Sequence, residues 1–353
     1  MGLENVKGRN RDPLPPHNIK PFNITTSLTR IDFPEYSLRG WHVFLSEYEI
    51  SSIMGTVHVI GIADHFEDVP KLIFQEILRM RYSLFQLLTE LSSRPWIARL
   101  AGAAAKSAAS RRLISTFIRH YKIAAEEAEL PLEQYSSLNE FFIRRLRPGA
   151  RPVDPEETSV VSPVDGTVVE SGMIADDQTF EVKGQTYTVG ELLGDSPHTP
   201  RFTNGIFAVI YLSPSNYHRI HSPLDCTVIE FDRIPGKVYP VNDRGMRFMP
   251  KVLSGNTRLV TYLQHGKAIM ALVKVGAMNV SSIQYTAGAK PPEKLGKGEE
   301  FAYFEFGSTV VLLSNRGHFL PGERLTPGTP VRMGEKIGEV APMPDGGPSR
   351  SVL

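Results

Sequence analysis

The order of apolar and polar residues divides the chain into a helix-rich first part and a β-rich second part. From residue 71 to about residue 121, apolar side chains recur at helical spacing, with a break at Pro95. Residues 131–146 predict a further helix, because Ser137 followed three residues later by Glu140 is typical of a capped helix start. Short β-rich runs separated by Gly, Pro and Asp then continue to the end. This order predicts an α+β fold, with N-terminal amphipathic helices followed by a β-rich body like a sandwich or barrel.

Three other stretches carry weaker structural signals. Residues 9–21 are polar and rich in proline, which predicts an extended or disordered segment. Residues 57–62 are apolar and β-branched enough to predict one buried strand. Residues 284–300 combine Gly, Pro and charged side chains, which predicts a mobile loop.

The strand-like run from Phe304 to Leu313 has an unusual centre. Aromatic and β-branched residues stand on both sides of Gly307 and Ser308, although glycine inside a strand offers no side chain for packing. One interpretation is a β-bulge or the close approach of another backbone. The other is self-cleavage, in which the Ser308 hydroxyl attacks the Gly307 carbonyl. That interpretation requires a base and an orienting carboxylate elsewhere in the chain.

Composition narrows the range of partners and compartments. Hydrophobic residues make up 41% of the 353 and charged residues 22%, which is typical of a soluble globular protein. The net charge of +1 predicts no strong affinity for nucleic acid. The single cysteine, Cys226, excludes an intrachain disulfide and a multi-cysteine metal site. We expect no secretory signal, and no bilayer-spanning helix because no apolar run reaches 18 residues.

Positive charge concentrates in the predicted helical part. Residues 71–151 contain 14 Lys and Arg against 7 Glu and no Asp. Within residues 84–118, basic side chains alternate with aromatic and aliphatic ones, a pattern that suits a helix lying in an anionic membrane surface. The alternative is an ordinary helix that packs on its own domain and exposes a charged face.

Two further segments supply candidates for the chemistry at Ser308. The segment SPVDGT (162–167) contains Asp165 in an Asp-Gly pair, which by itself is typical of a turn. The segment YHRIHSP (217–223) contains His218 and His221, and histidine is the usual general base near neutral pH. No carboxylate or cysteine stands at zinc-site spacing from these histidines, so we predict no metal site. Together, in the order Asp, His and Ser, the segments favour a chemical site.

These segments resemble those of the phosphatidylserine decarboxylases, pyruvoyl-dependent enzymes made as proenzymes. The matching pieces are SLNEFFIRRL (137–146), RPGARPV (147–153), SPVDG (162–166), YHRIHSP (217–223), VGA (275–277), FGST (306–309) and GEKIG (334–338). The resemblance implies three parts: an extension of unknown role (1–79), a helical membrane-associating region (80–150) and a β-rich catalytic domain (151–353).

The resemblance also implies a role for each candidate residue. Asp165 orients and charges His221, which is the base that activates Ser308. The chain then divides between Gly307 and Ser308, and the shorter fragment has 46 residues. A pyruvoyl group derived from Ser308 is the implied cofactor, and it forms a Schiff base with the amine of the substrate. His218 assists decarboxylation or reprotonates the product carbon.

The implied partners follow from a lipid substrate. Phosphatidylserine would be converted to phosphatidylethanolamine, a step of phospholipid biosynthesis. The resemblance therefore implies a peripheral membrane protein at the cytoplasmic face of a bacterial cell membrane, bound to an anionic surface. It also implies that the two fragments stay together as a heterodimer, and that these heterodimers form a dimer.

Two other functions use the same residues. One is a different self-processing enzyme or a hydrolase that uses Asp165, His221 and Ser308, although the Gly-x-Ser-x-Gly pattern of many hydrolases is missing around Ser308. The other is a non-catalytic sandwich module on a membrane-binding helical arm. Residues 162–168 and 333–338 resemble the opening and closing strands of lipoyl and biotin carrier domains, but no Met-Lys-Met tripeptide accompanies them.

Overall fold

The computed structural model describes residues 27–32, 36–38, 41–43, 45–52, 55–62, 102–277, 283–286, 291, 293–305 and 308–341. The chain forms two compact units, residues 1–81 and residues 82–353. The predictions for residues 9–21, for the helical pattern of 71–101 and for the backbone at Phe306 and Gly307 lie outside the described residues.

The first unit contains short antiparallel strands. One sheet has the order β1-β4-β5 and a second pairs β2 with β3. The strand predicted at residues 57–62 is confirmed as part of β5. The bounds are β1 (Ser27–Asp32), β2 (Tyr36–Leu38), β3 (Trp41–Val43), β4 (Leu45–Ser52) and β5 (Gly55–Ile62).

The described part of the second unit starts at residue 102 with short helical pieces. Residues 102–106 are helical, and after Ser107 the chain forms the 3₁₀ helix η1 (Ala108–Leu113) and then α3 (Ile114–Tyr121). The helix predicted over residues 131–146 is wrong in extent, because only η3 (Leu132–Gln134) and α4 (Leu138–Phe142) form there.

The chain's own hydrogen bonds explain the short α4. Ser137 caps it, since its hydroxyl accepts a hydrogen bond from the Glu140 amide at 3.2 Å. The Glu140 carboxylate accepts from the Ser136 amide at 2.7 Å instead of reaching the Ser137 amide. Beyond α4, the backbone amide of Arg147 donates a hydrogen bond to the Glu127 carbonyl at 2.9 Å. An extended bridge therefore replaces the last predicted helical turn.

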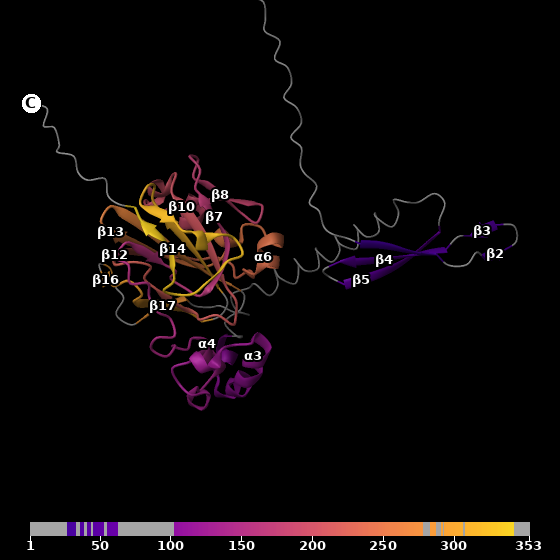
Figure 1. The fold of residues 1–353 in the computed structure, drawn as a ribbon, viewed down its shortest axis with the longest axis horizontal. Coiled ribbons are helices and arrows are strands. Elements are labelled where there is room, and N and C mark those ends of the chain that lie inside the picture. Colours follow the sequence, from indigo (N-terminus) through magenta and orange to yellow (C-terminus); the bar gives the residue numbers. More distant parts are fainter. Residues whose placement is uncertain are drawn as a thin grey trace, which may run out of the picture. The chain divides into compact units, whose positions relative to one another are not determined.

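The main body is built on one eight-stranded sheet, whose described pairings are all antiparallel (Figure 1). Its outer strands β16 and β20 have no pairing with each other among the described residues, so the sheet is open and the barrel-like part of the prediction is corrected. The α+β class is confirmed. In spatial order the strands are β16 (Glu293–Leu295), β12 (Cys226–Ile234), β13 (Arg258–His265), β14 (Ala268–Gly276), β18 (Ser308–Ser314), β10 (Ile206–Leu212), β7 (Gly166–Met173) and β20 (Pro330–Val331).

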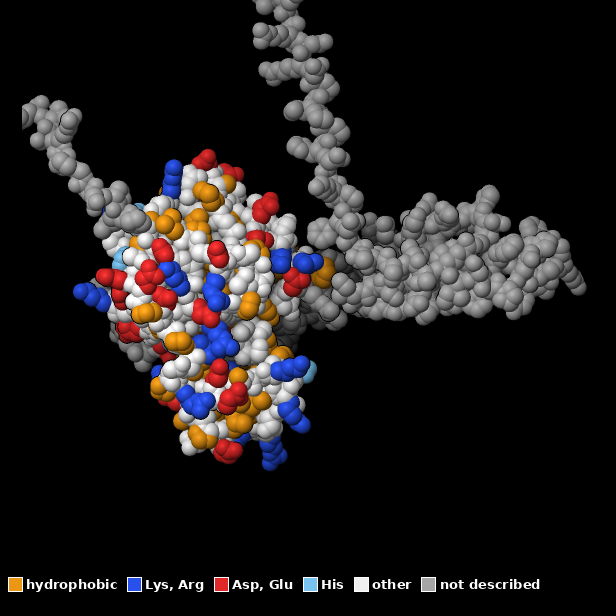
Figure 2. Space-filling model, in the orientation of Figure 1, with side chains coloured by type: hydrophobic (Ala, Val, Ile, Leu, Met, Phe, Trp, Pro, Cys, Tyr) orange, Lys and Arg blue, Asp and Glu red, His pale blue; other side chains and the backbone are white. Residues whose placement is uncertain are grey.

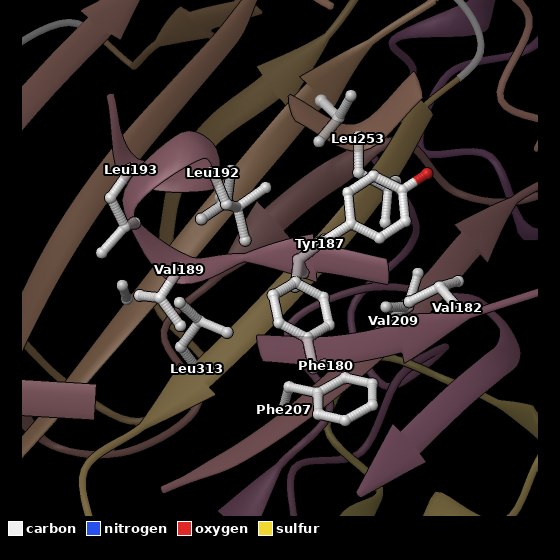
Figure 3. Close-up of a cluster of buried hydrophobic side chains, with 14 of the residues drawn as sticks. Phe180, Val182, Tyr187, Val189, Leu192, Leu193, Phe207, Val209, Leu253 and Leu313 are labelled. Carbon is white, nitrogen blue, oxygen red and sulfur yellow. The ribbon is translucent and has the colours of Figure 1, made fainter. Parts of the chain in front are cut away.

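Successive side chains along a strand point to opposite sides of the sheet. Other elements cover both sides of this sheet, so both faces are buried. Val311 and Leu313 of β18 face a core shared with Phe180, Tyr187 and Leu192 (Figure 3). The helices and hairpin that cover this face are β8 (Thr179–Val182), β9 (Gln185–Thr188), α5 (Val189–Leu193), η4 (Thr199–Phe202), α6 (Asp243–Phe248) and α7 (Val252–Gly255).

The opposite face carries the second core. Val310 and Leu312 of β18 pack there with Ile220, Phe301 and Ile283 of a small covering sheet. That sheet has the order β11 (Arg219–His221), β17 (Glu300–Phe304) and β15 (Ile283–Tyr285). A further small sheet pairs β19 (Phe319–Pro321), β21 (Lys336–Val340) and β6 (Ser159–Val161), and the remaining 3₁₀ helices are η2 (Ala125–Glu127) and η5 (Glu323–Leu325).

This arrangement corrects the prediction of one strand from residue 304 to residue 313. β17 belongs to the small covering sheet, whereas β18 lies fifth in the eight-stranded sheet. The chain therefore passes from one sheet to the other between Phe304 and Ser308. The stretch 284–300, predicted as a mobile loop, contributes residues to β15, β16 and β17.

Candidate active site

The Asp-containing and His-containing segments lie side by side through backbone hydrogen bonds. The His221 amide donates to the Pro163 carbonyl at 2.9 Å, and the Val161 amide donates to the Pro223 carbonyl at 2.8 Å. Glycine at position 166 suits this close packing, because a Cβ there would lie 2.6 Å from the Tyr211 carbonyl oxygen of β10. The Asp-Gly pair therefore serves a close approach to the sheet as well as a bend.

Asp165 is buried and holds a full set of hydrogen-bond partners. Arg151 donates to Asp165 Oδ2 from Nη2 at 2.7 Å and to Oδ1 from Nε at 2.9 Å. The Met333 amide also donates to Oδ1 at 2.8 Å. Arg151 bridges further to Glu127 at 2.9 Å, so this guanidinium joins the helical part to the β-rich body. Burial opposes the Arg151 charge, but its bonds to Asp165 and Glu127 outweigh that effect and raise the pKa of Arg151.

His221 is also buried, and its two ring nitrogens have distinct partners. Nδ1 lies 2.8 Å from the Gly298 carbonyl oxygen, so this nitrogen must carry the proton. Nε2 therefore accepts a hydrogen bond from the Tyr217 hydroxyl, which lies 3.0 Å away. Burial lowers the pKa of His221, while the Gly298 bond and the negative charges of Glu300 and Asp165 oppose that shift. The ring is thus held neutral in the form that a general base requires.

His218 is completely buried and has one nitrogen without a partner. Its Nδ1 donates to the Asn216 carbonyl at 2.9 Å, and its ring packs at 4.0 Å from the Phe142 ring of α4. Its Nε2 has no hydrogen-bond partner within the described structure. Burial, together with the positive charge of Arg144, lowers the pKa of His218 to about 3. A neutral imidazole with a free lone pair is therefore available at this point.

Ser308 opens β18 and is fully buried, and its hydroxyl also lacks a partner in the described part of the chain. By alternation with Val310 and Leu312, its side chain lies on the face covered by the small sheet. Ser308 pairs with Leu212 of β10, and the Phe304 amide donates to the His218 carbonyl at 3.0 Å. The segments 212–218 and 304–308 are therefore tied together at both ends.

The structure brings the predicted residues into one region without forming a continuous triad. His218 and Ser308 belong to the two tied segments, and His221 follows directly on β11. Among the described residues, Asp165 makes no hydrogen bond to His221 and acts on it through charge alone. Gly307 lies outside the described residues.

Sequence reasoning missed Arg151, Arg144 and Gly298, which position or surround these groups. Arg151 and Arg144 lie inside two of the segments that match the family. For Arg144, its position directly after the apolar residues 141–143 was the available signal. The Gly298 carbonyl gave no signal, because any residue presents a carbonyl.

Two surface hollows lie elsewhere and do not include these residues. One, of about 510 Å³, is lined by residues such as Glu170, Met173 and Lys183, and the other, of about 410 Å³, by Asp225, Gln264 and Gly266. In the part of the chain that the structure describes, no helix is long and apolar enough to cross a membrane.

Comparison with known proteins gives one consistent result. The phosphatidylserine decarboxylase family profile matches residues 138–339. Phosphatidylserine decarboxylase proenzymes of Geobacillus kaustophilus and Halalkalibacterium halodurans are each 42% identical over 259 residues, which is 73% of this chain and 97% and 98% of those proteins. The proenzyme of Anoxybacillus flavithermus is 42% identical over 258 residues, 73% of this chain and 96% of its own length. The chain therefore belongs to the phosphatidylserine decarboxylase family of enzymes.

Proposed function

We propose that this protein converts phosphatidylserine to phosphatidylethanolamine, using a pyruvoyl group that it makes from Ser308 by cutting its own chain after Gly307. The observation that carries the proposal is the buried Ser308 hydroxyl, which has no hydrogen-bond partner among the described residues and lies on a segment tied to that of His218. A serine hydroxyl with no structural partner fits a group that is consumed in a reaction.

The self-cleavage step needs only residues of this chain and one water. The Ser308 hydroxyl attacks the Gly307 carbonyl, and the peptide C–N bond breaks as an ester forms. Elimination releases the Gly307 carboxylate, and water then displaces ammonia to leave the pyruvoyl group at position 308. His221 is the proposed base, because its Nε2 is a neutral acceptor. For this step the Tyr217 hydroxyl either turns aside or relays the proton.

The pyruvoyl group supplies a carbonyl that withdraws electrons as CO₂ leaves. The surrounding residues do the rest. His218, neutral and with a free Nε2, is the proposed group that handles the proton at the carbon that loses CO₂. The buried rings of Phe142 and His218 exclude water from this point, which favours loss of the carboxylate charge.

The first prediction is the mass of the purified protein under denaturing conditions. We expect two pieces, one of 307 residues and one of 46 residues that begins in a pyruvoyl group. The Ser308→Ala variant is the control and should give one 353-residue chain without decarboxylase activity. A single uncut chain that releases CO₂ from phosphatidylserine would contradict the proposal, because it would contain no pyruvoyl group. A cut protein that does not release CO₂ would retain the processing step and discard the substrate.

We also propose that the helical part rests on the anionic surface of the membrane, as a peripheral protein at the cytoplasmic face of a bacterial cell. Leu113 and Tyr121 are large hydrophobic side chains that are 55% and 39% exposed at the ends of η1 and α3. Arg111, Arg112 and Arg119 are exposed on the same elements, and Figure 2 shows Lys and Arg side chains projecting around this part of the molecule. The cut fragments would remain one heterodimer, and we propose a dimer of these.

The second prediction concerns this membrane contact. Arg111→Glu combined with Arg112→Glu should weaken binding to anionic vesicles, since each basic residue near the surface contributes about 1 kcal/mol. Sedimentation with phosphatidylserine-containing vesicles measures the effect, and Arg324→Glu on η5 of the β-rich body is the matched control. Equal sedimentation of all three proteins would rule out this surface as the membrane contact.

A further inference from the structure

Arg144 follows α4 and is a buried cation with no carboxylate in salt-bridge contact among the described residues, although the negative charges of Asp165 and Glu127 act on it from farther away. The residue is 5% exposed, and its Nε and Nη1 have no hydrogen-bond partner within the described structure. Its single hydrogen bond runs from Nη2 to the Ser215 carbonyl and is long, at 3.4 Å. The carbon at the centre of its guanidinium lies 5.0 Å from the centre of the Phe141 ring, which is within cation–π distance.

The neighbouring arginines show what is missing at Arg144. Arg151 pairs with Asp165 and Glu127, Arg219 pairs with Glu300, and Arg145 lies 3.5 Å from Glu300. No carboxylate lies within 4 Å of Arg144 in the described ranges. Burial consequently lowers the pKa of Arg144, although arginine stays protonated in proteins. A buried guanidinium with free donors is the expected form of a site whose anion comes from outside.

Arg144 lies beside the candidate catalytic groups. Its partner Ser215 is in the segment between Leu212, which pairs with Ser308, and His218. Two residues before Arg144, the Phe142 ring packs on His218, whose pKa the Arg144 charge helps to lower. A ligand anion at Arg144 would therefore lie next to the reacting centre.

We propose that Arg144 binds the phosphodiester of the phospholipid substrate; this inference rests on the proposed function. The substrate offers two anions, its carboxylate and its phosphate. A strong ion pair to the carboxylate would stabilise the substrate against loss of CO₂, because that charge disappears in the reaction. The phosphate keeps its charge from substrate to product, and the planar fork of a guanidinium matches two phosphate oxygens.

The test uses Arg144→Met, with Arg144→Lys as the conservative variant and Arg145→Met as the matched control. Arg145 is adjacent, 58% exposed and paired at 3.5 Å with Glu300. The probe is sn-glycero-3-phosphoethanolamine, which has the phosphodiester without the carboxylate, and free serine provides the carboxylate without the phosphate. Binding is measured from the rise in unfolding temperature of the mature protein with probe concentration, so that no turnover is needed.

We expect Arg144→Met to weaken phosphodiester binding by about ten- to one hundred-fold, the usual range for losing charged hydrogen bonds. Arg144→Lys should give an intermediate loss, and Arg145→Met none. Arg144→Met should still mature and unfold at no lower temperature, because the variant removes an uncompensated buried charge.

Three outcomes would overturn the inference. One is unchanged binding of the phosphodiester probe, and another is a loss confined to serine, which would assign Arg144 to the carboxylate. The third is failure of both Arg144 variants to fold, which would make the guanidinium part of the core. An intact Arg144 effect in a protein that shows no decarboxylation would instead retain this site and discard the proposed function.

Discussion

Two buried arginines, seven residues apart, occupy opposite kinds of surroundings. Arg151 spends its donors on Asp165 and Glu127, and Asp165 is completed by the Met333 amide. Arg144 reaches one carbonyl at 3.4 Å, and its charge acts on His218. His218 Nε2 and Ser308 Oγ likewise have no hydrogen-bond partner within the described structure. The polar groups around Arg151 are hydrogen-bonded to one another. Those around Arg144 have donors or acceptors without a partner within the described structure.

The difference teaches that burial alone does not identify a structural ion pair. In a region whose polar groups are all partnered, removing one partner strands another buried charge. In a region whose groups lack partners within the described structure, the proposed function would supply them, as the substrate and the peptide bond to be cut. The proposed chemistry belongs to the second region, and the first holds it in place.

The largest expected effect comes from breaking the satisfied region. Arg151→Met would leave Asp165 and Glu127 without their cation, and Asp165 has a side chain only 5% exposed. We expect a loss of about 3–5 kcal/mol in the free energy of unfolding. Urea unfolding of the Ser308→Ala chain, which stays in one piece, measures this loss.

The matched control for this variant is Arg324→Met. Arg324 pairs with Glu335 at 3.2 Å, but its side chain is 54% exposed, so the expected loss is below about 1 kcal/mol. The comparison between the two regions breaks if Arg151→Met costs no more than Arg324→Met, or no more than Arg144→Met.

A smaller expected effect is the pH dependence of the free energy of unfolding that His218 causes. The pKa of His218 is about 3 in the folded chain and near 6.5 when unfolded, so below pH 6.5 the unfolded chain binds the extra proton. Stability should fall as the pH falls from 6.5 towards 3, by up to about 1.4 kcal/mol per pH unit. Between pH 7 and pH 5 the His218 contribution to this loss is about 2 kcal/mol. His218→Asn, whose amide can replace the Nδ1 donor, should remove it.

This pH effect is measured by urea unfolding at both pH values, again with Ser308→Ala in each chain. The exposed His120→Asn is the control and should leave the wild-type pH dependence in place. An identical pH dependence with and without His218 would mean that the buried ring finds a compensating contact on protonation, and that it belongs with the satisfied groups.

Local patterns predicted the β-rich body and the segments that carry the site. The continuous apolar run over residues 310–313 predicted the strand, because a strand buried on both faces has no polar alternation. Backbone hydrogen bonds join the two segments around residues 162–167 and 217–223, which the sequence analysis had singled out together. The catalytic roles of Asp165, His218, His221 and Ser308 stay predictions.

What sequence could not supply depends on contacts between distant residues. The Met333 amide reaches Asp165 across 168 residues, and no side-chain pattern announces a backbone donor. The predicted helix at 131–146 was too long because the bridge between Ala128 and Leu146 competes with its last turn. The run from 304 to 313 resembled one strand because apolar residues stand on both sides of Gly307 and Ser308, although Phe304 ends β17 and Ser308 begins β18 in a different sheet.

The position of β18 inside the eight-stranded sheet sets an order of events in the life of the molecule. In the proposed short fragment, β18 pairs with β14 and β10, β20 with β7, and β21 with β6. Three strands of the short fragment are therefore hydrogen-bonded to strands of the long fragment. Folding must therefore come first and cutting second. Once cut, a molecule that unfolds loses the covalent link that held its two halves at high effective concentration. Each copy would thus fold only once, and its working lifetime would be set by its rate of unfolding.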